Sequence, residues 1–136
     1  MNMTRKAAII GGGVIGGGWA ARFLLNGWNV SVFDPDPQAE RKISEVLANA
    51  RASLPALSDL PMCAEGQLSF AQTITEAVQG AHYIQESVSE RLDLKHRVFA
   101  QIQQSAELGT PIGSSTSGFK PSELQQNAAN PATIFV

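Results

Sequence analysis

Short apolar runs alternate with amphipathic segments along most of the chain. The apolar runs predict six strands, over residues 7–10, 29–33, 68–71, 81–85, 111–114 and 132–136. Apolar residues spaced three or four apart predict helices between them, over residues 16–26, 36–52, 74–78, 90–105 and 121–127. Strands that alternate with helices are typical of a mostly parallel sheet with helices on both faces. The pattern therefore predicts an α/β fold of the doubly wound, Rossmann type.

Residues 53–66 depart from this alternation, since they hold two prolines and one glycine. They predict a long connection or a broken helical turn. The sequence contains no internal repeat, low-complexity tract or linker between domains, and its 136 residues suit one domain on the usual scale of roughly 100–200 residues. We therefore predict a single domain over residues 1–136.

Composition and charge exclude several classes of protein. Hydrophobic residues make up 43% and charged residues 16%, which indicates a folded globular protein rather than a disordered or fibrous one. A net charge of -2 offers no basic surface for nucleic acid or acidic lipid. No apolar stretch approaches the roughly 18 residues of a membrane span, the first apolar run is too short for a signal peptide, and Cys63 has no partner for an internal disulfide. We expect a cytoplasmic protein with no nucleic-acid or membrane partner and no metal.

Six glycines fall in the eight positions 11–18, directly after the first predicted strand. The spacing of Gly11, Gly13 and Gly16 fits G-x-G-x-x-G, a motif in which the first glycine makes a tight turn and the third lets the helix pack on the strand. The second lets a pyrophosphate approach the backbone, where N–H groups at the helix N-terminus bind it. We predict dinucleotide contacts from Gly11, Gly13, Val14, Ile15 and Gly16.

An acidic residue completes this pattern. Asp34 ends the next predicted strand, 18 residues after Gly16, where a carboxylate can accept hydrogen bonds from ribose hydroxyls. The alternative is a glycine-rich turn in which Asp34 only caps the following segment, but motif and spacing agree independently on a dinucleotide. Asp34 and Asp36 would stand where the 2′-phosphate of NADP needs a cation, so NAD is the predicted cofactor. Arg41 could approach such a phosphate and is predicted instead to point to solvent.

Three longer segments carry a resemblance to a known family. They read AAIIGGGVIGGGWAARFLLNGWNVSVFDPDP, IQESVSERLDLKHRVF and IGSSTSGFKPSEL. Together they resemble the L-3-hydroxyacyl-CoA dehydrogenases and their relatives, and most of all the carnitine 3-dehydrogenases among them. The resemblance implies oxidation of a secondary alcohol by hydride transfer to NAD. It makes L-carnitine and 3-dehydrocarnitine the leading substrate pair and a 3-hydroxyacyl-CoA the alternative.

The same resemblance assigns roles to three further residues. It places Glu90 near the nicotinamide, directs Lys95 to the ribose side of the cofactor, and brings Ser117 into contact with both the nicotinamide and the substrate oxygen. Without it, Glu90 reads equally well as an acid at a helix N-terminus, and the serines as turn residues bonded to nearby backbone. The family's usual residue at Ser115 is asparagine, so no role is assigned to Ser115.

The reaction also needs a base that takes the hydroxyl proton of the alcohol. His96 is predicted to lie at the surface and His82 to be structural, so neither is expected to be that base. In the family the base is a histidine oriented by a glutamate, just after the strand that here reads ATIFV, and a helical domain that forms the dimer follows. We therefore expect residues 1–136 to be the cofactor half of a longer homodimeric enzyme, the alternative being a stand-alone NAD-binding module without turnover.

Overall fold

The structure, a computed structural model, describes residues 3–136 and contains one parallel sheet of six strands in the order β3-β2-β1-β4-β5-β6. The strands are β1 (Lys6–Ile10), β2 (Asn29–Phe33), β3 (Leu68–Phe70), β4 (Tyr83–Glu86), β5 (Ile112–Ser114) and β6 (Ile134–Phe135). The helices are α1 (Val14–Leu25), α2 (Ala39–Ser53), α3 (Ile74–Val78), α4 (Leu92–Ser105) and α5 (Pro121–Leu124). This confirms the predicted doubly wound α/β fold.

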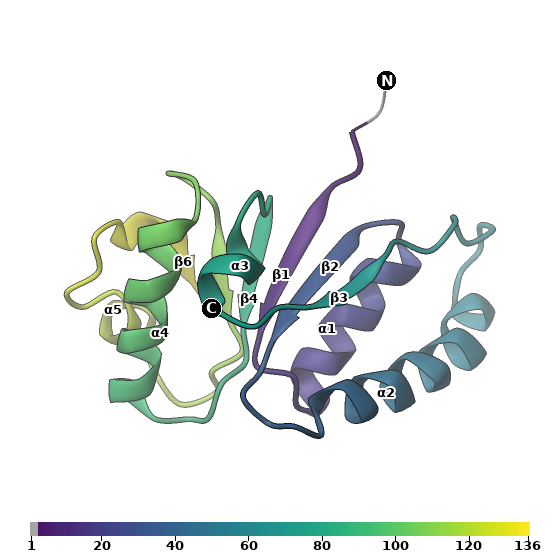
Figure 1. The fold of residues 1–136 in the computed structure, drawn as a ribbon, viewed down its shortest axis with the longest axis horizontal. Coiled ribbons are helices and arrows are strands. Elements are labelled where there is room, and N and C mark those ends of the chain that lie inside the picture. The colour runs from purple at the N-terminus through teal and green to yellow at the C-terminus, as the bar shows by residue number, and fades with distance from the viewer. Residues whose placement is uncertain (1–2) are drawn as a thin grey trace.

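Two apolar layers hold the helices on opposite faces of the sheet (Figure 1). Successive side chains of a strand point to opposite faces, and β1 is apolar from Ala7 to Ile10 because both of its faces are buried there. Ala7 and Ile9 pack in one layer with α1 and α2, whereas Ala8 and Ile10 pack in the other with α3, α4 and α5. The strand order reverses at β1, which lies between β2 and β4.

Because all strands are parallel, the loops that follow β1, β2, β4 and β5 gather at one edge of the sheet, at the bottom of Figure 1. In doubly wound folds, ligands bind outside the carboxyl ends of the strands where the strand order reverses. The glycine cluster, Asp34, Glu90 and Ser117 all belong to these loops or their borders. The topology therefore brings residues from four separate segments to the same edge of the sheet.

Several predicted boundaries need correction. Glu90 lies in the loop after β4, because α4 begins only at Leu92. The last helix ends at Leu124 rather than 127, and Asn127 follows with a positive φ of 62° that no continuing helix could hold. The last strand is shortened to two residues because Pro131–Thr133 forms a 3-10 turn. Residues 53–66 form the expected connection, with a single 3-10 turn at Leu54–Leu57.

Candidate functional site

The turn between β1 and α1 brings strand, turn and helix into close contact. Gly11 has a φ of 103°, and a Cβ built on it would lie 2.5 Å from the carbonyl oxygen of Ser87. A Cβ on Gly16 would overlap the carbonyl oxygen of Gly11. These two glycines are therefore required by the local packing. Gly13 differs from both, because a Cβ there would meet no atom within 4 Å among residues 3–136.

The N-terminus of α1 is open to a ligand. Gly13 is the N-cap residue, and no side chain in the described part of the chain caps the helix. Val14 and Ile15 form its first turn and leave 83% and 60% of their surface exposed. Backbone N–H groups at the start of a 12-residue helix favour a bound anion, in part through the helix dipole. The turn can therefore bind a pyrophosphate in front of Gly13.

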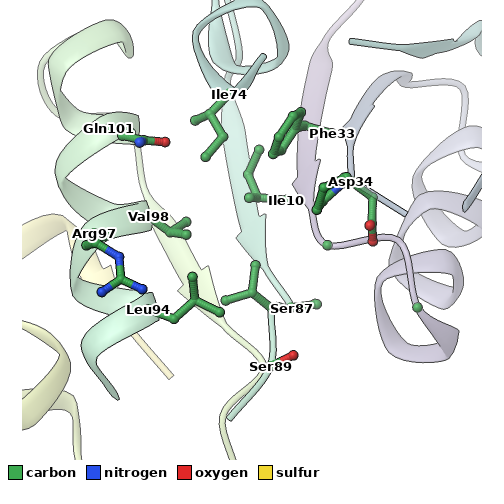
Figure 2. Close-up of a pocket in the computed structure, with 14 residues that line it drawn as sticks. Ile10, Phe33, Asp34, Ile74, Ser87, Ser89, Leu94, Arg97, Val98 and Gln101 are labelled. Carbon is green, nitrogen blue, oxygen red and sulfur yellow. The ribbon is translucent and has the colours of Figure 1, made fainter. Parts of the chain in front are cut away.

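A cleft of about 450 Å³ opens beside this turn, between the ends of β1, β2 and β4 and helix α4 (Figure 2). Its apolar lining includes Ile10, Phe33, Ile74, Leu94 and Val98. Its polar lining includes Asp34, Ser87, Ser89, Arg97 and Gln101. Apolar walls with a few placed polar groups are the usual composition of a small-molecule site. The cleft suits a flat ring that is joined to hydroxylated and anionic groups.

The carboxylate of Asp34 is fixed at the border of this cleft. It accepts hydrogen bonds from the backbone N–H groups of Gly12, at 2.5 Å, and of Asp36, at 2.8 Å. Asp36, the other acid of this segment, forms an exposed ion pair of 2.7 Å with Lys42. Arg41 is exposed and pairs with Glu45, which confirms that it points to solvent.

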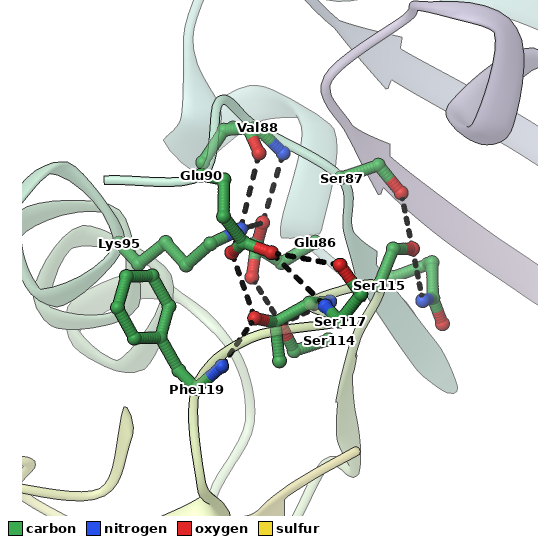
Figure 3. Close-up of polar contacts among 11 residues, drawn as sticks. Glu86, Ser87, Val88, Glu90, Lys95, Ser114, Ser115, Ser117 and Phe119 are labelled. Atoms are coloured by element: carbon green, nitrogen blue, oxygen red, sulfur yellow. Dashed lines mark hydrogen bonds and ion pairs between the residues drawn. The ribbon is translucent and has the colours of Figure 1, made fainter. Parts of the chain in front are cut away.

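Glu90 and Ser117 meet between the loops that follow β4 and β5 (Figure 3). One carboxylate oxygen of Glu90 accepts from the Thr116 hydroxyl at 2.7 Å, and the other accepts from the Ser117 N–H at 2.9 Å. The Ser117 N–H and the Thr116 hydroxyl hold the pKa of Glu90 below its usual value, since both bonds favour the ionised carboxylate. The carboxylate thus ties the two loops together.

Lys95 reaches into the protein rather than toward solvent. Its ammonium lies 2.7 Å from Glu86 and donates to the carbonyl of Val88 at 3.0 Å. The Glu86 carboxylate also accepts from the Ser114 hydroxyl at 2.5 Å and the Val88 N–H at 2.8 Å. Lys95 and Glu86 are both fully buried, at 1% and 0% exposed. A contact of Lys95 with the ribose side of a cofactor stays a prediction, and Glu86 was not singled out from the sequence.

Comparison with known proteins decides the family. The 3-hydroxyacyl-CoA dehydrogenase, NAD binding domain, matches residues 6–136. The chain belongs to the 3-hydroxyacyl-CoA dehydrogenase family. A solved NAD+ dependent dismutase, 5-formyl-3-hydroxy-2-methylpyridine 4-carboxylic acid 5-dehydrogenase, has a TM-score of 0.85 and 34% identity over 97% of this chain and 43% of its own.

Two curated relatives are named for carnitine. The L-carnitine dehydrogenase/betainyl-CoA thioesterase of Ruegeria pomeroyi is 69% identical over 96% of this chain and 27% of its own length. The L-carnitine dehydrogenase of Mesorhizobium japonicum is 57% identical over 92% of this chain and 34% of its own. The chain thus spans about a third or less of the length of these members of the 3-hydroxyacyl-CoA dehydrogenase family.

The described residues fit NAD, the cofactor of this domain in the 3-hydroxyacyl-CoA dehydrogenase family. The space in front of Gly13 leaves room for a pyrophosphate where a Cβ would intrude, and Asp34 borders the adjoining cleft. Arg97 and Gln101 also line that cleft from one face of α4, and sequence reasoning missed them. Their spacing of four residues, next to the apolar Val98, places both on the same face of a helix and could have identified them from the sequence.

Ser115, where the family resemblance expects asparagine, takes part in a row of hydrogen bonds. The Ser115 hydroxyl accepts from the Gln85 side chain at 2.8 Å and lies 2.6 Å from the Ser87 hydroxyl. Gln85 in turn accepts from the Tyr83 hydroxyl at 2.6 Å, and burial raises the pKa of that phenol. Ser115 therefore belongs to a row of hydrogen bonds that runs from Tyr83 through Gln85 to Ser87 at the cleft.

Neither histidine lines the cleft of this 3-hydroxyacyl-CoA dehydrogenase domain. His82 accepts from the backbone N–H of Lys6 at 3.0 Å, at the opposite edge of the sheet. His96 lies on α4, and its Nε2 is 2.6 Å from the carbonyl oxygen of Glu123. Within residues 3–136 no group of three or more metal-binding side chains is assembled. None of the helices in that range has the length and apolar character of a membrane span.

Proposed function

We propose that the chain is the NAD-binding part of an L-carnitine dehydrogenase, which oxidises L-carnitine to 3-dehydrocarnitine by hydride transfer to NAD. The observation that carries the proposal is the identity of 69% and 57% to two relatives that bear this activity in their names. A 3-hydroxyacyl-CoA dehydrogenase is the alternative, and a binding module without turnover is the second.

The charges of the described residues favour carnitine over a CoA thioester. Phosphate groups of CoA require cations, and residues 53–66 contain no lysine or arginine. Arg51, on the preceding helix, donates two hydrogen bonds to the carboxylate of Glu65, at 2.7 and 2.9 Å, in a bidentate ion pair. That guanidinium is therefore already engaged. L-carnitine has no phosphate groups, so it needs no set of cations to bind them.

Each named residue then has a role in holding the reactants. The backbone of Gly11, Gly13, Val14, Ile15 and Gly16 binds the pyrophosphate at the start of α1. When bound, NAD supplies the nicotinamide carbon that accepts the hydride.

The remaining roles lie at the ribose and nicotinamide ends. Asp34 accepts from the ribose hydroxyls. Glu90 holds the loop of Ser117, whose hydroxyl donates to the substrate oxygen as the alcohol becomes a carbonyl. On the same resemblance, Lys95 supports the ribose side of the cofactor, and its ammonium lies 3.6 Å from the Glu90 carboxylate.

We expect residues 1–136 alone, supplied with saturating NAD and L-carnitine, to form no measurable NADH. Both histidines are bonded elsewhere, and a positioned base is worth about 10²–10⁴-fold. A chimera in which this chain replaces the matched 125 residues of the Mesorhizobium japonicum enzyme is expected to form NADH. NADH absorbance follows both reactions, with 3-hydroxybutyryl-CoA as the competing substrate.

The outcomes separate the three candidates. Oxidation of the CoA substrate but not of carnitine by the chimera would favour the alternative dehydrogenase. A chimera that folds and oxidises neither would favour the binding module. NADH formation by the chain alone would place the base within residues 1–136, with His82 and His96 as the first residues to replace.

We also propose, from the family resemblance, that the longer protein is a cytoplasmic homodimer. It binds a small-molecule substrate and has no nucleic-acid or membrane partner. Sedimentation of the longer protein tests the dimer directly.

A further inference from the structure

A carboxylate that is fully buried lies beside Lys95, close to Glu90. Glu86 ends β4, is 0% exposed, and receives three donors, from Lys95, Ser114 and the N–H of Val88. Burial of a carboxylate costs several kcal/mol unless a cation and hydrogen bonds compensate it. The three donors around Glu86 supply that compensation. The proposed function uses Glu90, Lys95 and the loops around them but leaves Glu86 without a role.

Two carboxylates compete for the single ammonium of Lys95 (Figure 3). The ammonium lies 2.7 Å from Glu86 but 3.6 Å from Glu90, too far for a hydrogen bond. The two carboxylate oxygens of Glu90 instead accept hydrogen bonds from the Thr116 hydroxyl and the Ser117 N–H. The unequal distances therefore leave Glu90 free to hold the loop after β5.

We propose that Glu86 is a positioning residue: it retains the Lys95 ammonium and keeps it off Glu90, so that Glu90 can hold Ser117 in place. This inference rests on the proposed function, because it concerns the group that faces the nicotinamide there. Glu86 itself, at 0% exposed, touches neither cofactor nor substrate and acts through Lys95 and Glu90.

The Glu86→Gln substitution removes the negative charge of this side chain but keeps its shape. The amide oxygen can still accept from Lys95 and Val88, and its nitrogen can face the Ser114 hydroxyl, so the buried bonds are largely retained. Glu90 then becomes the sole carboxylate beside the ammonium. The ammonium is expected to move toward Oε1 of Glu90, which it already faces at 3.6 Å, and to draw the carboxylate away from the Ser117 N–H, which bonds to Oε2.

Amide hydrogen exchange of the 136-residue chain without cofactor tests this directly. In Glu86→Gln, exchange at Ser117 is expected to accelerate by about tenfold, the change that loss of one hydrogen bond to a charged group produces. The central β1 amide of Ile9 reports global folding and is expected to keep its protection. Unchanged exchange at Ser117 in a folded variant would overturn the proposal.

The double variant Glu86→Gln/Lys95→Met distinguishes positioning from a merely structural effect. It removes the ammonium that competes for Glu90, so protection of Ser117 is expected to return to within about threefold of the wild type. Faster exchange that persists in the double variant would overturn the proposal, since Glu86 would then act through Ser114 instead. If Glu86→Gln alone also loses protection at Ile9, the proposal is judged on the double variant, in which protection of Ser117 must return to within about threefold of the wild type.

Ligand titrations connect the result to the site. Glu86→Gln is expected to weaken NADH binding by about fivefold and ADP-ribose binding by less than about twofold, because ADP-ribose lacks the nicotinamide that Ser117 faces. Equal weakening of both ligands would overturn the proposed link to the nicotinamide end. A wild-type chain that binds neither would contradict the proposed function, while the exchange rates would still test the role of Glu86.

Discussion

Replacement of Gly13 by alanine is expected to weaken NADH binding by about 10- to 100-fold, which corresponds to the roughly 1–3 kcal/mol that an extra methyl costs in a filled site. The methyl group would occupy the space in which the pyrophosphate approaches the backbone. Folding should be spared, because a Cβ at Gly13 meets no described atom within 4 Å. Calorimetric titration and thermal unfolding measure the two effects separately.

Gly18→Ala is the matched control for this experiment. A Cβ at Gly18 also meets no described atom within 4 Å, but Gly18 lies a turn further along α1. Alanine there should leave NADH binding unchanged and stabilise the helix by about 0.5–1 kcal/mol. Normal NADH binding by the Gly13 variant would show that the glycine motif does not bind the pyrophosphate.

Replacement of Lys95 by methionine is expected to lower the free energy of unfolding by about 3–5 kcal/mol, because Glu86 would remain buried without its cation. That loss is a large part of the roughly 5–15 kcal/mol that stabilises a typical domain. Urea denaturation with an unchanged m-value measures it.

Lys42→Met removes the same functional group from an ion pair of the same length. The Lys42–Asp36 pair also measures 2.7 Å, but 47% of the lysine side chain is exposed, against 2% for Lys95. Its loss should change stability by less than about 1 kcal/mol. Similar losses in both variants would show that burial does not determine the strength of the Lys95 pair.

The local parts of the site could be predicted from the sequence. The glycine motif is contiguous, and its place after an apolar strand identified the turn that Gly11 and Gly16 form. Asp34 was found because strand β2 is short and ends where its apolar residues end. Both features depend on local chain geometry, which hydrophobic periodicity and glycine spacing express directly.

The remaining parts depend on contacts between distant segments. The bond from Glu90 to Ser117 joins residues 27 positions apart, and the bond from Glu86 to Ser114 joins residues 28 apart. The pattern of a single strand or helix does not report such pairs. Glu86 offered one signal, an acid at the end of a central strand, with Lys95 nine positions later.

Titration of the 136-residue chain with NADH and NADPH tests the central claim most directly. The carboxylate of Asp34 would oppose the 2′-phosphate of NADPH, and like charges in contact cost enough to separate the two affinities by about tenfold or more. The account predicts that NADH binds more tightly by at least this factor. Equal affinities, or tighter binding of NADPH, would contradict it.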